Sequence, residues 1–234
     1  MKYLSEDLQV HNNLNPKLWN SDNELLSEVR EKIISIVKQF EEDLDNIPIN
    51  IVDIQLVGSN CSFNYTDHSD LDVHIMCNFE VISINPEILQ TVYNVKKTEF
   101  NKNYDISIKG IEVEMYVQDI KSSTTSNGIY SLCDDEWIKF PKPITNITHY
   151  DTSEEVSKWK KKIEHVLLFK DREDIVNAIN TLYLMRTNSI QVDGEYGKGN
   201  QIFKDIRNLG LLDDLKGALK EATARELSME SFIE

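Results

Sequence analysis

Cysteines, long apolar runs and basic residues are all scarce in this 234-residue chain. Its three cysteines, Cys61, Cys77 and Cys133, are too few and too scattered for a disulfide framework or a zinc cluster. No apolar run approaches the roughly 20 residues that cross a bilayer. The first residues, MKYLSEDLQVH, lack the apolar core of a signal peptide. We therefore expect a cytoplasmic protein with no membrane association.

Acidic residues outnumber basic ones, 40 against 25, which gives a net charge of −15. Residues 1–150 hold 12 Lys and Arg against 24 Asp and Glu, whereas residues 151–234 hold 13 against 16. Binding to long nucleic acids depends on many contacts between basic side chains and phosphates. The composition therefore argues against extended DNA binding. A small nucleotide held through Mg²⁺ remains compatible, because the metal supplies the local positive charge.

Two predicted strands flank a polar loop in the most informative stretch of the chain. The β-branched run Ile51–Val57 predicts the first strand, which ends at Gly58-Ser59, and the run Leu71–Met76 predicts the second. A glycine lets the backbone approach a phosphate closely, and the Ser59 hydroxyl and nearby N–H groups can donate to it. Ser69 lies in the same loop, either as a further phosphate ligand or as a solvated hydroxyl.

The second predicted strand carries a pair of carboxylates. Asp70 and Asp72 are two residues apart, so their side chains share one face of the strand. Two like charges at a sheet end are unfavourable unless a cation neutralises them, and hard divalent cations prefer carboxylate oxygens. The pair is a candidate metal site. In the alternative, Asp70 caps the strand and Asp72 is solvated.

Two other residues near the aspartates have chemically versatile side chains. His74 shares their face, but Mg²⁺ prefers oxygen ligands, so we expect this histidine to be a neighbour of the site. Cys61 lies in the loop, and no surrounding sequence marks it as an activated thiolate. We therefore expect no nucleophilic role for it.

The stretch from Gly58-Ser59 to Asp70-Leu71-Asp72 resembles the signature of the DNA polymerase β-like nucleotidyltransferase superfamily. The resemblance implies an α+β fold, with a mixed catalytic sheet and helices followed by a C-terminal helical half that forms a cleft. It also implies a nucleoside triphosphate substrate, two Mg²⁺ (or Mn²⁺) ions, and Asp70 and Asp72 as catalytic, metal-binding residues. Gly58, Ser59 and Ser69 would then bind the nucleotide.

The resemblance further implies a third carboxylate on a later strand. A predicted hairpin at 104–117 turns at Lys109-Gly110. Glu112 and Glu114 alternate onto one face of its second strand. We favour Glu114 as the third catalytic and metal-binding residue and keep Glu112 in reserve. Taken alone, both glutamates fit an exposed sheet face equally well.

The remaining pattern predicts one helix before the first strand and another between the second strand and the hairpin. A helix capped at Ser21 or Asp22 is expected to run to about Leu44, and another to begin at Pro86. A short strand is expected at 128–132 and an extended crossover at 137–143.

From Thr152 the pattern becomes helical, with Glu155 completing a predicted capping box. We expect a domain boundary near 141–151, which divides the chain into a catalytic domain, 1–150, and a helical domain that closes the nucleotide cleft, 151–234. Four helices are expected in the second domain, at about 152–169, 171–186, 200–208 and 211–227.

Basic residues of the helical half are candidates for binding the β- and γ-phosphates, as in similar enzymes. We favour Lys162 and Lys198, although a run of charges usually forms a solvated face. The other candidates in this half are Lys158, Lys161, Arg186 and Lys204.

Three further segments, LNPKLW, GIYSL and GKGNQIFKDIRNLGLLDDL, resemble stand-alone nucleotidyltransferases of bacteriophage genomes. The resemblance implies transfer of a nucleoside monophosphate from a triphosphate to a hydroxyl of an RNA or tRNA end, a small molecule, a protein or a second nucleotide. The alternatives are a cyclic or linear oligonucleotide second-messenger synthase, an inactive nucleotide-binding module, and a structural protein. The loop NCSFNYTDH lacks the Gly-Thr of many immune-signalling relatives, which disfavours a cyclic-nucleotide synthase.

Overall fold

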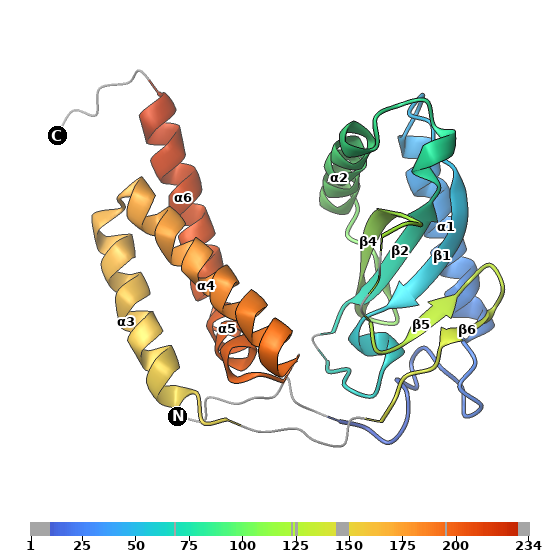
Figure 1. Ribbon diagram of the computed structural model, residues 1–234, viewed down its shortest axis with the longest axis horizontal. Coiled ribbons are helices and arrows are strands. Elements are labelled where there is room, and N and C mark those ends of the chain that lie inside the picture. Colours follow the sequence, from blue (N-terminus) through green and yellow to red (C-terminus); the bar gives the residue numbers. More distant parts are fainter. Residues whose placement is uncertain are drawn as a thin grey trace. The chain divides into compact units, whose positions relative to one another are not determined.

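The structure, a computed structural model, describes residues 10–67, 69–122, 124, 126–143, 150–194 and 196–228 (Figure 1). These residues form two compact units. The first unit comprises the described residues up to 143, and the second comprises those from 150 onward. The expected boundary near 141–151 lies largely outside the described residues. The roles assigned to residues 1–150 and 151–234 stay predictions. None of the helices in the described part of the chain has the length and apolar content of a membrane span.

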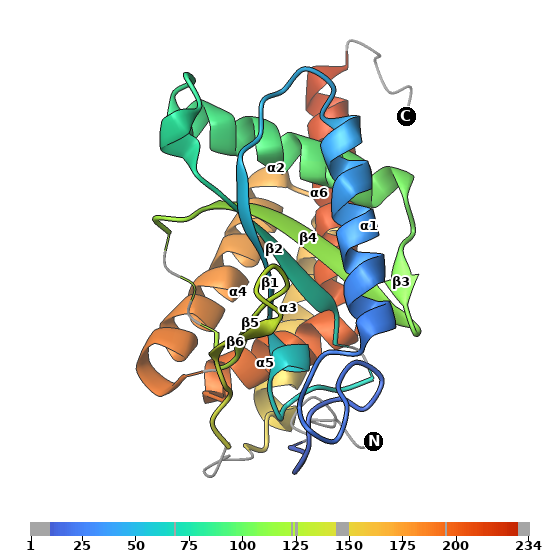
Figure 2. The same cartoon turned by 90° about the vertical axis from the view of Figure 1, so that its right-hand side faces the viewer.

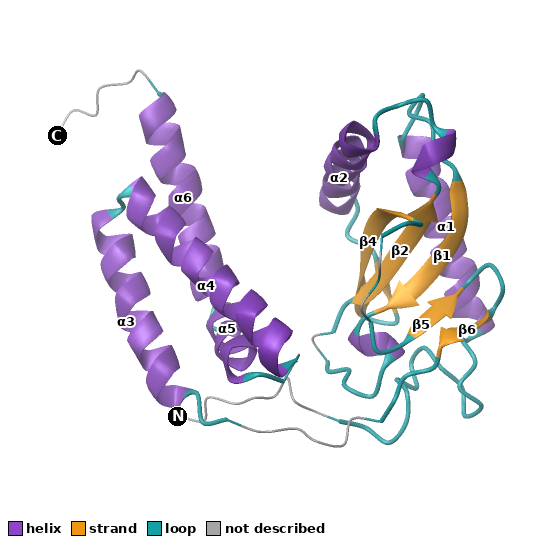
Figure 3. Cartoon of the chain, in the orientation of Figure 1, coloured by secondary structure: helices purple, strands orange, loops and turns teal. Residues whose placement is uncertain are grey.

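The first unit contains a six-stranded mixed sheet with the strand order β3-β4-β2-β1-β5-β6 (Figure 3). Its neighbours are antiparallel except for β2 and β4, which run parallel. The expected α+β class is confirmed. The elements are α1 Ser27–Asp43, β1 Ile51–Val57, η2 Ser59–Cys61, β2 Leu71–Cys77, η3 Phe79–Val81, α2 Pro86–Asn103, β3 Ser107–Ile108, β4 Ile111–Asp119, β5 Ile129–Ser131 and β6 Glu136–Lys139.

Alternation along β2 and β4 gives the sheet an apolar face and a polar face. Val73 of β2 and Met115 of β4 are fully buried in one core that also contains Ile33 of α1 and Tyr93 of α2. β2 and β4 lie side by side in this sheet (Figure 2). Half-buried polar side chains alternate with these core residues, and they include Asp72, His74, Glu114, Tyr116 and Gln118.

The start of the first helix differs from expectation. α1 begins at Ser27, and the predicted cap at Ser21 or Asp22 is wrong. Trp19 and Leu25 instead form a β-bridge, and both side chains are buried in the core. Burial of these large apolar side chains outweighs the gain from an earlier capped turn.

The expected crossover at 137–143 is also partly wrong, because β6 pairs antiparallel with β5 as a hairpin. Trp137 of β6 stacks on Trp19 with the ring centroids 4.5 Å apart, and packs edge-on against Tyr130 of β5 at 5.2 Å. This aromatic cluster ties the hairpin to the segment before α1.

The second unit is built from four helices with a core of their own, and the expected four helices are confirmed. The capping box is not formed: the Thr152 hydroxyl donates to Asp205 at 2.5 Å, and Glu155 forms an ion pair with Lys198. A buried acceptor on another helix therefore takes the place of the local cap. The helices are α3 Ser153–Phe169, α4 Arg172–Asp193, α5 Lys198–Asn208 and α6 Leu211–Leu227.

Candidate functional site

Two of the predicted carboxylates face each other across adjacent strands. Asp72 of β2 is the register partner of Glu114 of β4, and both side chains are on the polar face of the sheet. Asp70 lies just before β2, where it is exposed. Asp70, Glu112 and Glu114 border one pocket of about 380 Å³ in the first unit. Glu112 is exposed and paired in register with Ser107 of β3, so Glu114 remains the better partner for Asp72.

Gly58 is packed directly against the Asp72 carboxylate. Val57, the last residue of β1, is the register partner of Asp72, so the turn that follows lies beside this side chain. Gly58 has φ +77° and ψ −163°, a region that only glycine adopts readily. A Cβ at this position would lie 1.9 Å from Asp72 Oδ2. The glycine is therefore required to leave room for the carboxylate, a role that the sequence pattern did not predict.

A chain of hydrogen bonds orders the loop between β1 and β2. The Ser59 hydroxyl donates to Ser69 Oγ at 2.8 Å, and the Thr66 N–H donates to the same oxygen at 2.9 Å. The Asn60 side chain donates to the carbonyls of Ser69 and Asp70, at 3.1 and 2.8 Å. The two predicted nucleotide-binding serines therefore contact each other, and their role toward a nucleotide stays a prediction.

Asn60 is a positioning residue that the sequence analysis missed. It is fully buried, and its side-chain oxygen and its carbonyl accept hydrogen bonds from Asn15 and from the Trp19 indole, both at 2.8 Å. Asn60 thus joins the segment before α1 to the segment that ends at Asp70. An asparagine in a polar loop carries no sequence signal for burial, since this residue type is common in exposed turns.

We expect Asn60→Ala to lower the free energy of unfolding by about 3 kcal/mol, because several buried polar groups would lose their partners. Urea denaturation followed by circular dichroism measures this change. Asn94→Ala, at an exposed position of α2, is the matched control and should change stability by less than about 0.5 kcal/mol. Equal denaturation midpoints for the two variants would contradict the role given to Asn60.

Glu114 is contacted by a lysine and a tyrosine. The Tyr116 hydroxyl donates to Glu114 Oε1 at 2.6 Å, and Lys97 Nζ of α2 lies 3.6 Å from the same oxygen. Lys97 Nζ is also 3.7 Å from the centroid of the Tyr116 ring. Burial and the hydrogen bond to Glu114 raise the pKa of the Tyr116 phenol well above its usual range, so it stays a donor. Lys97 was missed, because nothing in the pattern of α2 distinguishes it from the neighbouring Lys96.

His74 shares the face of Asp72, as alternation predicts, and is the register partner of Tyr116. Its Nδ1 lies 2.8 Å from Gln118 Oε1. Burial lowers the pKa of His74, although the hydrogen bond to Gln118 opposes this shift. Gln118 also donates to Thr124 at 3.2 Å, so this face is linked to the loop that follows β4.

Cys61 is fully buried, and its burial, together with the charge of Asp72, raises the pKa of the thiol well above its ordinary value. A protonated, inaccessible thiol is no nucleophile, in agreement with the sequence analysis. His68, the other histidine near the aspartates, lies outside the described residues.

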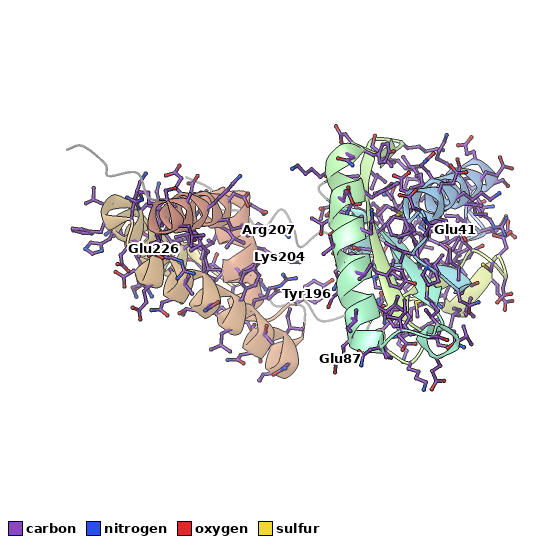
Figure 4. The ribbon with its side chains drawn as sticks, turned by 90° about the horizontal axis from the view of Figure 1, so that it is seen from above. Glu41, Glu87, Tyr196, Lys204, Arg207 and Glu226 are labelled. Carbon is purple, nitrogen blue, oxygen red and sulfur yellow. The ribbon has the colours of Figure 1, made fainter. Side chains whose placement is uncertain are left out.

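The two lysines favoured as phosphate ligands belong to the second unit. Lys162 is exposed, with its Nζ 4.7 Å from the centroid of the Trp159 ring, and Lys198 is paired with Glu155. Figure 4 shows Lys204, a further candidate, near Arg207 on α5. The binding of phosphate by Lys162 and Lys198 stays a prediction.

Comparison with known proteins finds weak structural similarity. No protein family and no curated protein sequence matches the chain. A STING-associated CdnE c-di-GMP synthase from Capnocytophaga granulosa is 11% identical, with 87% of this chain and 84% of that chain covered and a TM-score of 0.26. The CdnE cyclic dinucleotide synthase of Elizabethkingia meningoseptica, solved with GTP and Apcpp, is 13% identical, with 84% and 75% covered and a TM-score of 0.27. At such TM-scores neither similarity identifies a function.

The donor atoms of the predicted site fit the expected cation. Asp70, Asp72 and Glu114 present only carboxylate oxygens, which are the ligands that Mg²⁺ and Mn²⁺ prefer. The absence of a side chain at Gly58 leaves room for the Asp72 carboxylate. Across the described ranges, no three His, Cys, Asp or Glu side chains are gathered closely enough to hold one ion. Glu114 is instead engaged by Lys97 and Tyr116.

Proposed function

We propose that the chain is a metal-dependent nucleotidyltransferase that moves a nucleoside monophosphate from a nucleoside triphosphate to a hydroxyl acceptor. The observation that carries this proposal is the pairing of Asp72 with Glu114 across parallel strands, beside a glycine turn that packs on Asp72. Adjacent carboxylates repel each other unless positive charge balances them, and a bound divalent cation would supply such charge.

Each residue has a defined role in the proposed reaction. Two divalent cations, when bound, would stabilise the attacking and leaving oxygens of an in-line displacement. Asp70 and Asp72 would hold the cation that accompanies the triphosphate. Glu114 would hold the second cation and orient the acceptor hydroxyl.

The phosphates of the nucleotide would be bound by neutral and basic groups. Gly58, Ser59 and Ser69 would contribute N–H and hydroxyl donors, because they lie between the strand end and the aspartates. Lys162 and Lys198 would provide positive charge for the β- and γ-phosphates, to which lysine binds as a point charge.

The acceptor is proposed to be something other than a long nucleic acid, since 24 acidic against 12 basic residues in positions 1–150 disfavour a long polyanion. A small molecule, a tRNA end or a protein hydroxyl fits this composition. A second nucleotide as acceptor would make the chain a second-messenger synthase.

The test is to incubate the pure protein with each nucleoside triphosphate, labelled at the α-phosphorus, and with Mg²⁺ or Mn²⁺. Parallel reactions contain no acceptor, total tRNA or a mixed protein extract, and the Asp70→Asn/Asp72→Asn variant is the control. A new nucleotide without added acceptor supports second-messenger synthesis, whereas label in tRNA or protein identifies the acceptor class. Nucleotide binding without any product would refute the enzyme and favour an inactive binding module.

A further inference from the structure

Lys97 reaches the carboxylate that the proposed reaction needs for its second cation. Its Nζ is 3.6 Å from Glu114 Oε1, and its side chain is only 18% exposed although lysines are rarely buried. Lys96, the preceding residue on α2, contacts Glu99 one turn further along the same helix at 3.1 Å. Of these two lysines, only Lys97 links α2 to the polar face of the sheet.

The contacts of Lys97 and Tyr116 occupy one oxygen of Glu114. The tyrosine hydroxyl donates to Oε1 at 2.6 Å, and the ammonium group lies 3.7 Å from the centroid of the same tyrosine ring. The three side chains therefore form one cluster, in which Lys97 supplies the positive charge that balances the glutamate. A divalent cation at this oxygen would lie close to the ammonium group, and the two positive charges would repel each other.

Other contacts attach α2 to β4 and to the segment before β1. The Gln90 amide donates to the Val117 carbonyl of β4 at 2.9 Å, and the Tyr93 hydroxyl donates to the Pro48 carbonyl at 2.6 Å. The attachment of this helix therefore does not depend on Lys97. A role confined to holding α2 does not account for a poorly exposed lysine directed at the candidate third metal ligand.

We propose that Lys97 competes with a divalent cation for Glu114. The inference rests on the proposed function, because it takes Glu114 as the third metal ligand. Lys97 balances the charge of Glu114 before the second cation arrives and releases it when that cation binds. The Glu114 position is consequently the weaker of the two metal positions in the absence of nucleotide.

The experiment measures Mn²⁺ binding to the full chain without nucleotide, from the electron paramagnetic resonance signal of the free ion. Lys97→Met and Lys97→Gln remove the competing charge and should tighten the weaker site about fivefold, the effect of losing one partly exposed ion pair. Lys97→Arg keeps the charge and should bind Mn²⁺ within twofold of the unmodified protein. Lys96→Met is the matched control for a charge lost from α2 away from Glu114, and it should also stay within about twofold.

The results for Mn²⁺ binding distinguish failure of the proposed competition from failure of the proposed function. Equal Mn²⁺ affinity in the unmodified protein, Lys97→Met and Lys97→Gln, together with loss of binding in Asp72→Asn, would overturn the competition alone and leave the proposed function standing. Weaker binding in both uncharged variants would overturn it as well, because Lys97 would then support the metal site. No Mn²⁺ binding by any variant would overturn both the competition and the proposed function. Circular dichroism confirms that the variants fold, and Lys97→Gln provides the test if Lys97→Met does not.

Discussion

Replacing Asp72 by asparagine is expected to reduce nucleotidyl transfer about a thousandfold while the fold is preserved. The substitution keeps the size and shape of the side chain but removes one negative charge from the pair formed with Glu114 across β2 and β4. Loss of a metal ligand at the reacting phosphate costs several kcal/mol of transition-state stabilisation. Initial rates of product formation at saturating Mg²⁺ measure the effect, with circular dichroism as the check on folding.

The matched control is Asp67→Asn, which removes the same charge from an exposed position in the loop between β1 and β2. This variant should keep its rate within about twofold, since exposed charges at a distance are screened. If Asp72→Asn retained full activity, or if both variants lost activity equally, the assignment of Asp72 as a metal ligand would be wrong.

The second large effect is expected for Gly58→Ala. Its Cβ would lie 1.9 Å from Asp72 Oδ2, so the carboxylate or the turn has to move. The glycine also has φ +77° and ψ −163°, a conformation that costs another residue about 1–3 kcal/mol. We expect a destabilisation of this size and a loss of activity of about a hundredfold, which is typical of a catalytic group displaced by about 1 Å.

Gly217→Ala in α6 is the control for the same chemical change. An added Cβ at Gly217 meets no atom within 4 Å, and alanine is favoured over glycine inside a helix by about 1 kcal/mol. This variant should therefore be slightly more stable and fully active. Thermal denaturation measures the change in stability, and the rate assay measures the change in activity. A fully active Gly58→Ala protein would contradict the prediction, because the Asp72 carboxylate would then tolerate displacement.

Local sequence patterns predicted most elements of the first unit. The strands β1, β2 and β4 follow from alternating or β-branched apolar runs, and α2 begins at Pro86 behind the capping side chain of Asn85. The errors occur where a distant partner replaces a local one. Trp19 stacks on Trp137 in the aromatic cluster. The Thr152 hydroxyl donates to Asp205 instead of closing a capping box.

The residues assigned to the candidate site stay a prediction, and the sequence did not indicate the contacts that Asn60 and Lys97 make there. Asp72 and Glu114 were paired through the resemblance, and the structure places them in register. Asn60 and Lys97 carried no signal, because buried and exposed asparagines or lysines look alike in one sequence. Their importance depends on which distant carbonyl or carboxylate each one reaches.

The sequence by itself determined most of the strands and helices, among them the strand, turn and strand that carry Gly58 and Asp72, and the net acidic charge of the chain. These properties depend on residue type and on the spacing of near neighbours. Only the tertiary structure decided that Gly58 packs against the Asp72 carboxylate and that Lys97 forms an ion pair with Glu114. Such contacts join elements that are separate in the chain, and strand pairing and helix docking create them when the apolar face of the sheet is buried.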